Sequence, residues 1–326
     1  MIWLWVLLGA AALLLLLGCL TAAELCVRKV TRATRHDETF VRRQETEGGF
    51  GAALDRYDRE WNRRPFTVES GGVTLSGEYV RNPADSGRPR RVVILCHGHT
   101  VTRLCQVKYA DLFYRAGYSL VLYDERYFGQ SGGTCCTLGQ EEAKDLSRVM
   151  AYTRTVFGQD CRIGLHGESM GAATVLLCLE REKPDFVIAD CPFASSTLLF
   201  RHVVRDQFHL PAFPILPMAA FLGRVQYGYD FPKVNPIRAV EGAEVPICFM
   251  HGEADSLIPW EHSKMMVAKC KDPRSVLHLF PGAEHACSIA SDPARYERLV
   301  LEFLSGCAAG DAKAAAAEQD EHKEEI

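Results

Sequence analysis

Two hydrophobic patterns alternate along residues 66–304. The continuous apolar run at 92–96 is typical of a strand buried on both faces, and further short, mainly apolar runs at 118–123, 161–166, 186–190, 245–250 and 276–280 also predict strands. Amphipathic segments predict helices at 106–116, 140–157, 172–180, 261–270 and 295–304. Two shorter strands, 66–68 and 75–80, flank a Ser-Gly-Gly turn. This alternation predicts an α/β fold whose mainly parallel sheet is covered by helices on both faces.

One interval interrupts the alternation. Residues 192–236 are rich in Phe, Leu and Pro and include the stretch HLPAFPILPMAAFL at 209–222. Connections this long in a compact domain are often lids. We predict a small helical cap at about 195–235. The pattern leaves open whether its apolar side faces a substrate or only packs on the domain.

The first residues form a separate apolar segment. Residues 1–23 carry no charge, and they exceed the roughly 20 residues that span a bilayer. A signal peptide or lipoprotein leader, which Leu16-Leu17-Gly18-Cys19 resembles, would begin with a basic region. Here the basic residues come afterwards, at Arg28, Lys29, Arg32 and Arg35. We therefore predict a single-pass anchor in the cell membrane, with the N-terminus outside and the remaining chain cytoplasmic.

These patterns divide the chain into four parts. A transmembrane anchor at 1–27 is followed by a charge-rich juxtamembrane linker at 28–65. A globular domain at 66–305 contains the predicted sheet and cap. Residues 306–326 form an acidic, low-complexity tail.

Composition narrows the classes of function. The chain has 326 residues and a net charge of −4, so we expect no nucleic-acid partner. Its thirteen cysteines include no C-x-x-C pair, which fits a reducing cytoplasm and gives no metal-binding pattern. We expect neither a metal nor another cofactor.

A candidate nucleophile lies in GLHGESMGA, residues 164–172. Ser169 stands between two glycines, directly after a predicted strand and before a predicted helix. This is the context in which G-x-S-x-G forms a nucleophile elbow. Glycine is needed there because neighbouring backbone crowds the turn. The same turn directs the backbone N–H of Met170 toward the position of an oxyanion.

A serine nucleophile needs a base, and the base needs an acceptor. His285 follows the last predicted strand in PGAEH, whereas we expect His251 and His97 to brace the backbone. Asp255, in HGEAD, is the predicted acid, and it also fits a turn aspartate. Glu253 and Asp190 are the alternatives.

The segment CHGHT at 96–100 follows the first long buried strand. Acyl transfer requires a second oxyanion donor, and losing one such donor costs about 10²–10³ in rate. We predict that the backbone N–H of His99 is this donor, with that of Thr100 as the alternative.

The motifs CHGHT, YDERYFGQSGG, GLHGESMGA, HGEAD and GAEH occur in the order found in the α/β-hydrolase superfamily. From about 66 to 304 the chain resembles that superfamily, and in particular a bacterial branch related to the prolyl oligopeptidase-like hydrolases. It departs from its relatives at Tyr127, where they often have glycine. The resemblance implies a Ser169–Asp255–His285 triad, with the amides of His99 and Met170 as the oxyanion hole.

We therefore expect a membrane-anchored, carboxylesterase-like serine hydrolase. Its substrate would be a small acyl ester or thioester, cleaved through an acyl-enzyme intermediate. An amidase or peptidase of the prolyl oligopeptidase-like type is the alternative enzyme. A membrane-anchored binding protein without catalysis is the alternative from another class.

Overall fold

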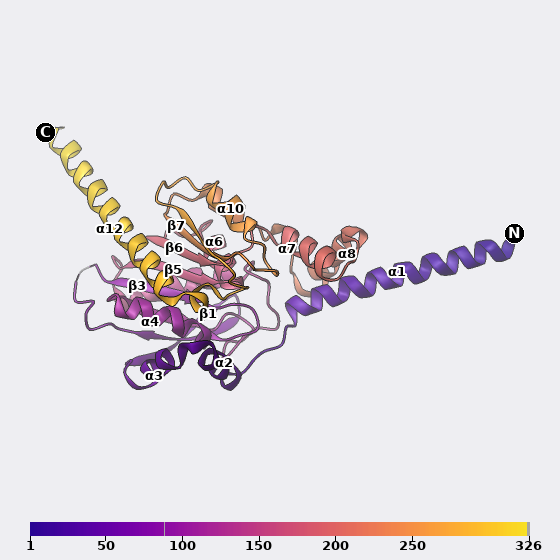
Figure 1. Ribbon diagram of the computed structural model, residues 1–326, viewed down its shortest axis with the longest axis horizontal. Helices are drawn as coiled ribbons and strands as arrows, with labels where there is room; N and C mark the ends of the chain where they lie inside the picture. Colours follow the sequence, from indigo (N-terminus) through magenta and orange to yellow (C-terminus); the bar gives the residue numbers. More distant parts are fainter. Residues whose placement is uncertain (88, 325–326) are drawn as a thin grey trace.

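The computed structural model describes residues 1–87 and 89–324, with side chains described up to residue 309. An eight-stranded sheet lies at its centre (Figure 1), in the order β1-β2-β4-β3-β5-β6-β7-β8. The strands are β1 (Arg63–Ser70), β2 (Val73–Val80), β3 (Arg91–Cys96), β4 (Ser119–Tyr123), β5 (Arg162–Glu168), β6 (Phe186–Asp190), β7 (Ile247–Gly252) and β8 (Val276–Phe280). β2 runs antiparallel to its two neighbours, and all pairs from β4 to β8 are parallel. The predicted α/β fold is confirmed.

Helices cover both faces of the sheet. The sheet-covering helices are α2 (Glu38–Glu45), α3 (Gly51–Arg59), α4 (Val107–Arg115), α5 (Glu142–Phe157), α6 (Met170–Cys178), α9 (Pro236–Gly242), α10 (Glu261–Val267), α11 (Ser288–Ser291) and α12 (Pro293–Glu324). Residues of α5, α6, α9 and α10 share one apolar core, and residues of α2, α3, α4 and α12 share the core on the other face. Strands β4, β6 and β7 are buried at every position because both of their faces are covered.

The segment between the N-terminal helix and the sheet packs on the domain. Helices α2 and α3 are joined by a short π-helix, η1 (Thr46–Phe50). Val41, Leu54, Tyr57 and Trp61 are buried in the core that also contains α4. The charged side chains of this segment predicted a linker, but its helices also carry an apolar face that packs into the core.

The interval after β6 forms a helical layer over the carboxyl ends of the strands. It contains α7 (Ser196–His202), the π-helix η3 (Val203–Gln207), α8 (Ala212–Tyr227) and the short 3-10 helix η4 (Phe231–Lys233). Ile215, Leu216 and Ala219 of α8 are buried. Leu199 and Val204 line a cavity beneath this layer. The layer therefore both packs on the domain and covers a cavity.

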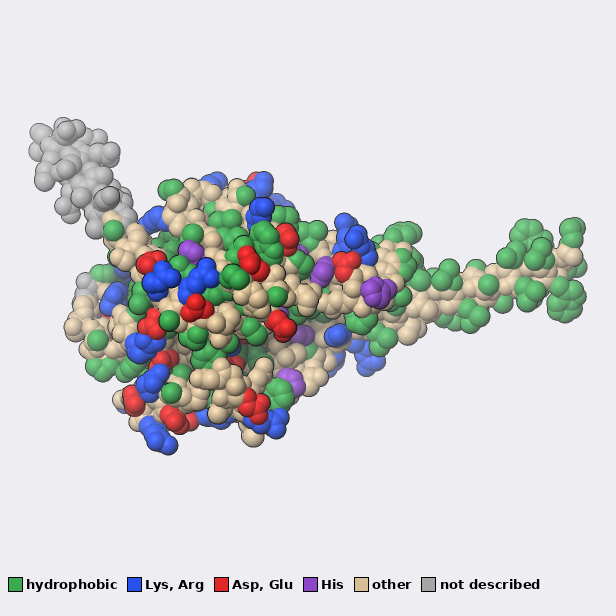
Figure 2. Space-filling view, viewed as in Figure 1, with side chains coloured by type: hydrophobic (Ala, Val, Ile, Leu, Met, Phe, Trp, Pro, Cys, Tyr) green, Lys and Arg blue, Asp and Glu red, His purple; other side chains and the backbone are tan. Residues whose placement is uncertain are grey.

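Helix α1 (Ile2–Thr31) projects away from the rest of the molecule (Figure 1). It is long and apolar enough to cross a membrane. Residues 1–18 are all exposed, and Figure 2 shows their hydrophobic side chains along the projecting rod. Its last turns are different, because Ala23, Val27 and Thr31 are buried where α1 packs beside α8.

The C-terminal helix α12 continues to Glu324. Its first part is anchored by Tyr296, Val300 and Phe303, which are buried against the sheet. The acidic tail predicted at 306–326 falls mainly on residues 310–326, whose side chains lie outside the described residues.

Candidate active site

Ser169 occupies a strained turn between β5 and α6. Its φ of 56° and ψ of −112° are rarely adopted by a non-glycine residue. A Cβ on Gly167 would lie 2.2 Å from the carbonyl oxygen of Gly171, and a Cβ on Gly171 would lie 2.1 Å from that of Cys96. The two glycines therefore allow β3, β5 and α6 to approach closely enough for this turn to form.

Adding a methyl group at Gly171 is expected to disturb this turn. The new Cβ meets backbone rather than a flexible side chain, so the strand or helix must shift, and such overpacking costs about 1–3 kcal/mol. We expect Gly171→Ala to lower the melting temperature of the full-length protein in detergent. Gly242→Ala is the matched control, because a Cβ there meets nothing within 4 Å. An equal melting temperature for both variants would contradict the crowding argument.

The structure brings Ser169, His285 and Asp255 together. The Oγ of Ser169 lies 2.8 Å from Nε2 of His285, and Nδ1 of His285 lies 2.7 Å from Oδ2 of Asp255. His285 follows β8 and Asp255 follows β7, so the three side chains come from the carboxyl ends of three parallel strands. The result is a continuous chain of hydrogen bonds from carboxylate to hydroxyl.

The surroundings of Asp255 keep it ionised. Its side chain is completely buried, whereas that of His285 is 22% exposed. Burial alone would raise the pKa of Asp255, but hydrogen bonds from His251 and His285 hold it well below its usual value. The other carboxylate oxygen, Oδ1, accepts from the backbone N–H groups of Leu257 and Ile258, at 3.0 and 2.8 Å. Asp255 is thus a fixed anion facing His285.

The alternative residues occupy other places. Glu253 is exposed, and Asp190 accepts hydrogen bonds from Tyr109 and Ser288 rather than facing His285. His97 accepts from the backbone N–H of Glu125 at 2.8 Å. His251 lies within hydrogen-bonding distance of the hydroxyl of Ser263 and the carbonyl of Ile258, and so ties together the loop that carries Asp255.

The two residues whose backbone amides were predicted to form the oxyanion hole lie beside Ser169. Met170 is the first residue of α6, so its N–H has no acceptor within the helix. His99 and Met170 both line the cavity that contains Ser169. The ring Nε2 of His99 is 3.0 Å from the carbonyl oxygen of Val30, so the imidazole contacts α1. Thr100, the alternative donor, has a φ of 73°, and its carbonyl accepts from the N–H of His36.

The cavity beside Ser169 has a volume of about 210 Å³ and a largely apolar lining. Three parts of the chain form its walls: the last turns of α1, the cap and the loops at the carboxyl ends of the strands. The lining residues are Cys26, Lys29, Val30, His99, Leu138, Ser169, Met170, Phe193, Leu199, Phe200, Val203, Val204, Gln207, Phe208, Leu257 and Ile258. An apolar chain attached to a carbonyl group at Ser169 fits this lining.

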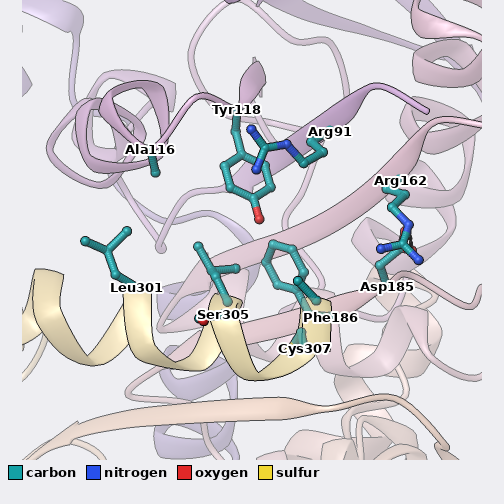
Figure 3. Close-up of a pocket in the computed structure, with 11 residues that line it drawn as sticks. Arg91, Ala116, Tyr118, Arg162, Asp185, Phe186, Leu301, Ser305 and Cys307 are labelled. Atoms are coloured by element: carbon teal, nitrogen blue, oxygen red, sulfur yellow. Dashed lines mark ion pairs between the residues drawn. The ribbon is translucent and has the colours of Figure 1, made fainter. Parts of the chain in front are cut away.

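A second cavity, of about 240 Å³, lies at the opposite end of the sheet (Figure 3). Arg91, Arg162 and Phe186, the first residues of β3, β5 and β6, line it, and α12 closes it. Arg162 pairs there with Asp185 at 3.6 Å. Ligands of open parallel sheets bind outside the carboxyl ends of the strands. We therefore assign the chemistry to the cavity beside Ser169.

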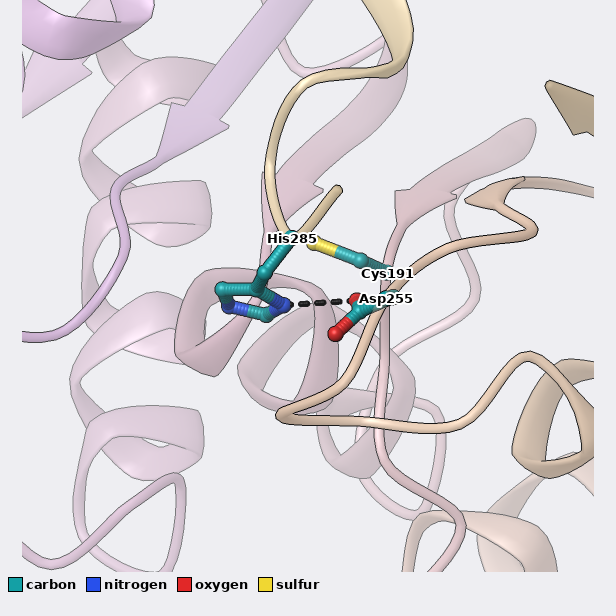
Figure 4. Close-up of side chains that lie close together, drawn as sticks. All are labelled: Cys191, Asp255 and His285. Atoms are coloured by element: carbon teal, nitrogen blue, oxygen red, sulfur yellow. Dashed lines mark hydrogen bonds and ion pairs between the residues drawn. The ribbon is translucent and has the colours of Figure 1, made fainter. Parts of the chain in front are cut away.

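Cys191 packs against the His285–Asp255 pair (Figure 4). Its sulfur, an Asp255 oxygen and a His285 nitrogen lie within 4.8 Å of one another. A metal would require the thiolate, but burial, with the neighbouring charge of Asp190, raises the pKa of Cys191 well above its ordinary value. Asp255 and His285 are already hydrogen-bonded to each other, so these two atoms are not free to bind a metal. This donor set does not fit a metal site.

A buried charge network beneath the elbow was not predicted from the sequence. Glu168, the residue before Ser169, pairs with Lys108 at 3.0 Å and accepts a hydrogen bond from Tyr109 at 2.7 Å. Lys108 also pairs with Glu45 of α2 at 3.2 Å. The only signal in the sequence was Glu168 itself, because a charged residue at the end of a buried strand needs a partner. Its partners are distant in sequence and resemble ordinary surface residues.

Glu45 makes folding stability depend on pH. Burial, together with the charge of Glu168, raises the pKa of Glu45 from 4.5 to about 7 despite Lys108. Between these values the folded protein keeps a proton that the unfolded chain releases, so stability falls as pH rises through this window. The wild type should lose about 2–3 kcal/mol more of its free energy of unfolding across this window than Glu45→Gln does. Melting temperatures of both proteins at pH 5 and pH 8 test this, and equal pH slopes would contradict it.

Comparison with known proteins identifies the family. A family model described as serine aminopeptidase, S33, matches residues 87–225. The uncharacterized protein YqkD of Bacillus subtilis is 33% identical over 272 residues, which cover 82% of this chain and 87% of that protein.

Solved structures agree in fold. The Pyrococcus furiosus esterase Pf2001 has a TM-score of 0.63 at 23% identity, over 77% of this chain and 93% of its own. The acylaminoacyl peptidase of Pyrococcus horikoshii has a TM-score of 0.59 at 16% identity, over 78% of this chain and 43% of its own. With the sheet order and the elbow, these findings show that the chain belongs to the α/β-hydrolase superfamily of serine hydrolases.

Proposed function

We propose that the protein is a membrane-anchored serine hydrolase that cleaves carboxylic esters or thioesters. The observation that carries this proposal is the hydrogen-bonded chain from Asp255 through His285 to Ser169, which opens on an apolar cavity. Ser169 is the nucleophile, His285 the base and Asp255 the acid. The backbone N–H groups of His99 and Met170 form the oxyanion hole.

The proposed reaction has two steps. Ser169 Oγ attacks the substrate carbonyl carbon while its proton passes to Nε2 of His285, 2.8 Å away. The amides of His99 and Met170 bind the oxyanion. The ester or thioester bond then breaks, and His285 returns the proton to the leaving oxygen or sulfur. Water, deprotonated by His285, attacks the acyl-enzyme and releases the acid and Ser169.

We infer membrane anchoring from α1. Signal sequences share its length and apolar composition, so these alone do not decide between the two. The packing of its last turns on the domain, where Ala23 and Val27 are buried beside α8, supports a helix that stays continuous with the domain. The basic residues Arg28, Lys29 and Arg32 follow the apolar part and support a cytoplasmic domain. In this proposal residues 1–27 are the anchor and 66–305 form the hydrolase domain; residues 28–65 connect the two and pack on the domain through α2 and α3.

A peptidase or amidase is the second candidate, because the matching family model describes an aminopeptidase. The lining of the cavity favours ester hydrolysis over peptide hydrolysis. Lys29, His99, Ser169 and Gln207 are the polar side chains in its lining, so few groups could pair with a peptide backbone. An amidase must also protonate a poorer, amine leaving group.

The test is a panel of p-nitrophenyl esters and matched anilides with acyl chains of two, eight and sixteen carbons. The full-length protein in lipid nanodiscs is used, since residues of α1 line the cavity. We expect ester turnover that is absent in Ser169→Ala. Turnover of anilides alone would favour the amidase. Silence on both, in folded protein, would leave an anchored binding protein.

A further inference from the structure

The last turns of α1 are part of the wall of the candidate active site. Cys26, Lys29 and Val30 line the cavity that also contains Ser169 and Met170. Residues 2–18 of the same helix are all exposed. At 1.5 Å per residue, Cys26 lies only about 12 Å along the helix from Gly18. The exposed apolar rod and the cavity wall are therefore consecutive parts of one helix.

Hydrogen bonds fix this wall to the domain. The carbonyl oxygen of Val30 lies 3.0 Å from the ring of His99, and that of Thr31 accepts from the N–H of Cys136 at 3.1 Å. The hydroxyl of Tyr127 donates to the carbonyl of Ala33 at 3.0 Å. Tyr127 adopts a φ of 74°, a conformation that favours glycine. At that strained position its side chain provides a contact with the chain just after α1 that glycine could not.

The surface around the α1–cap junction has the chemistry of a membrane interface. On the cap, Phe208, Phe213, Phe221 and Val225 are between 48% and 78% exposed. Lys29 of α1 lies over the ring of Phe208, 5.3 Å from its centroid, and so joins the helix to the cap at the cavity. Exposed aromatic and basic side chains beside an apolar helix match the headgroup region of an anionic leaflet.

We propose that the substrate is an acyl ester of a membrane lipid, whose chain lies between the last turns of α1 and the cap. This inference rests on the proposed function. The cavity, of about 210 Å³, accommodates the part of an acyl chain nearest the carbonyl. The carbons nearest the carbonyl fill the cavity, and the rest of a long chain follows α1 toward the bilayer.

The test narrows the cavity from the side of α1. Cys26→Trp places a large side chain in the wall, and Val30→Trp does so one turn further along. Leu25→Trp is the matched control, because Leu25 is 62% exposed and lies outside the lining. In nanodiscs, the ratio of kcat/KM for p-nitrophenyl palmitate to that for the acetate is measured for each protein.

We expect this ratio to fall about tenfold or more in Cys26→Trp and Val30→Trp, because excluding two methylene groups from the cavity has about that effect. It should stay within about twofold in Leu25→Trp. Equal ratios in all four proteins, or wild-type protein that cleaves acetate but not palmitate, would overturn the inference and leave the hydrolase intact. Failure of the wild type on both esters and with a fluorophosphonate would instead overturn the proposed function.

Discussion

Replacing Ser169 with alanine is expected to lower kcat for a carboxylic ester by about 10⁶-fold, the scale found when the nucleophile of a serine hydrolase is removed. The substitution removes the only hydroxyl bonded to His285 among the described side chains, and it leaves the cavity and the two candidate oxyanion amides in place. Initial rates with p-nitrophenyl octanoate, on full-length protein in nanodiscs, measure the effect.

Ser147→Ala is the control for this experiment. Ser147 lies on α5, where its hydroxyl donates to the carbonyl of Ala143, away from the cavity. We expect its kcat to match the wild type within about twofold. A Ser169→Ala protein with a normal melting temperature and wild-type turnover would show that another group is the nucleophile.

Replacing Asp255 with asparagine is expected to lower kcat by about 10⁴-fold, by analogy with the same change in other triads. The structure gives the reason. Oδ1 of Asp255 accepts from the N–H groups of Leu257 and Ile258. The amide oxygen of asparagine would keep that place, so its NH₂ group would face His285. Nδ1 would then have to accept, and Nε2 would carry the proton and be unable to take one from Ser169.

Glu253→Gln is the matched control, since Glu253 was the alternative acid in the same loop and is exposed. It should keep kcat within about twofold of the wild type. The measurement is kcat for p-nitrophenyl octanoate, together with the melting temperature of each variant. A large loss in Glu253→Gln, with little in Asp255→Asn, would reverse the assignment.

Much of the fold could be predicted from the sequence because a parallel sheet has a strong local signature. Continuous apolar runs such as 92–96 correspond to strands with both faces covered, and all eight predicted strands are present. The nucleophile elbow could also be predicted from neighbouring residues alone. A Cβ at Gly167 or Gly171 would lie within 2.2 Å of a backbone carbonyl oxygen, so the spacing of the two glycines in the motif is a direct steric requirement.

The remaining features depend on contacts between residues far apart in sequence. Nothing in an apolar N-terminal stretch indicates that Cys26 and Val30 line a cavity with Ser169. The charges of 28–65 predicted a linker, yet Val41 of α2 and Tyr57 of α3 are core residues. Glu45, Lys108 and Glu168 become one buried network only when α2, α4 and β5 are assembled. Such pairings are set by the tertiary structure and leave no periodic signal.

The most direct test of the central claim is labelling of the full-length protein by a fluorophosphonate, followed by peptide mass spectrometry. The phosphorus reagent reacts with a serine that is deprotonated by a neighbouring base. We expect a single adduct on Ser169 in the folded protein. Heat denaturation before labelling should abolish this adduct, and labelling of Asp255→Asn should be much slower than labelling of the wild type. Folded protein that stays unlabelled, or that carries the adduct on another residue, would contradict it.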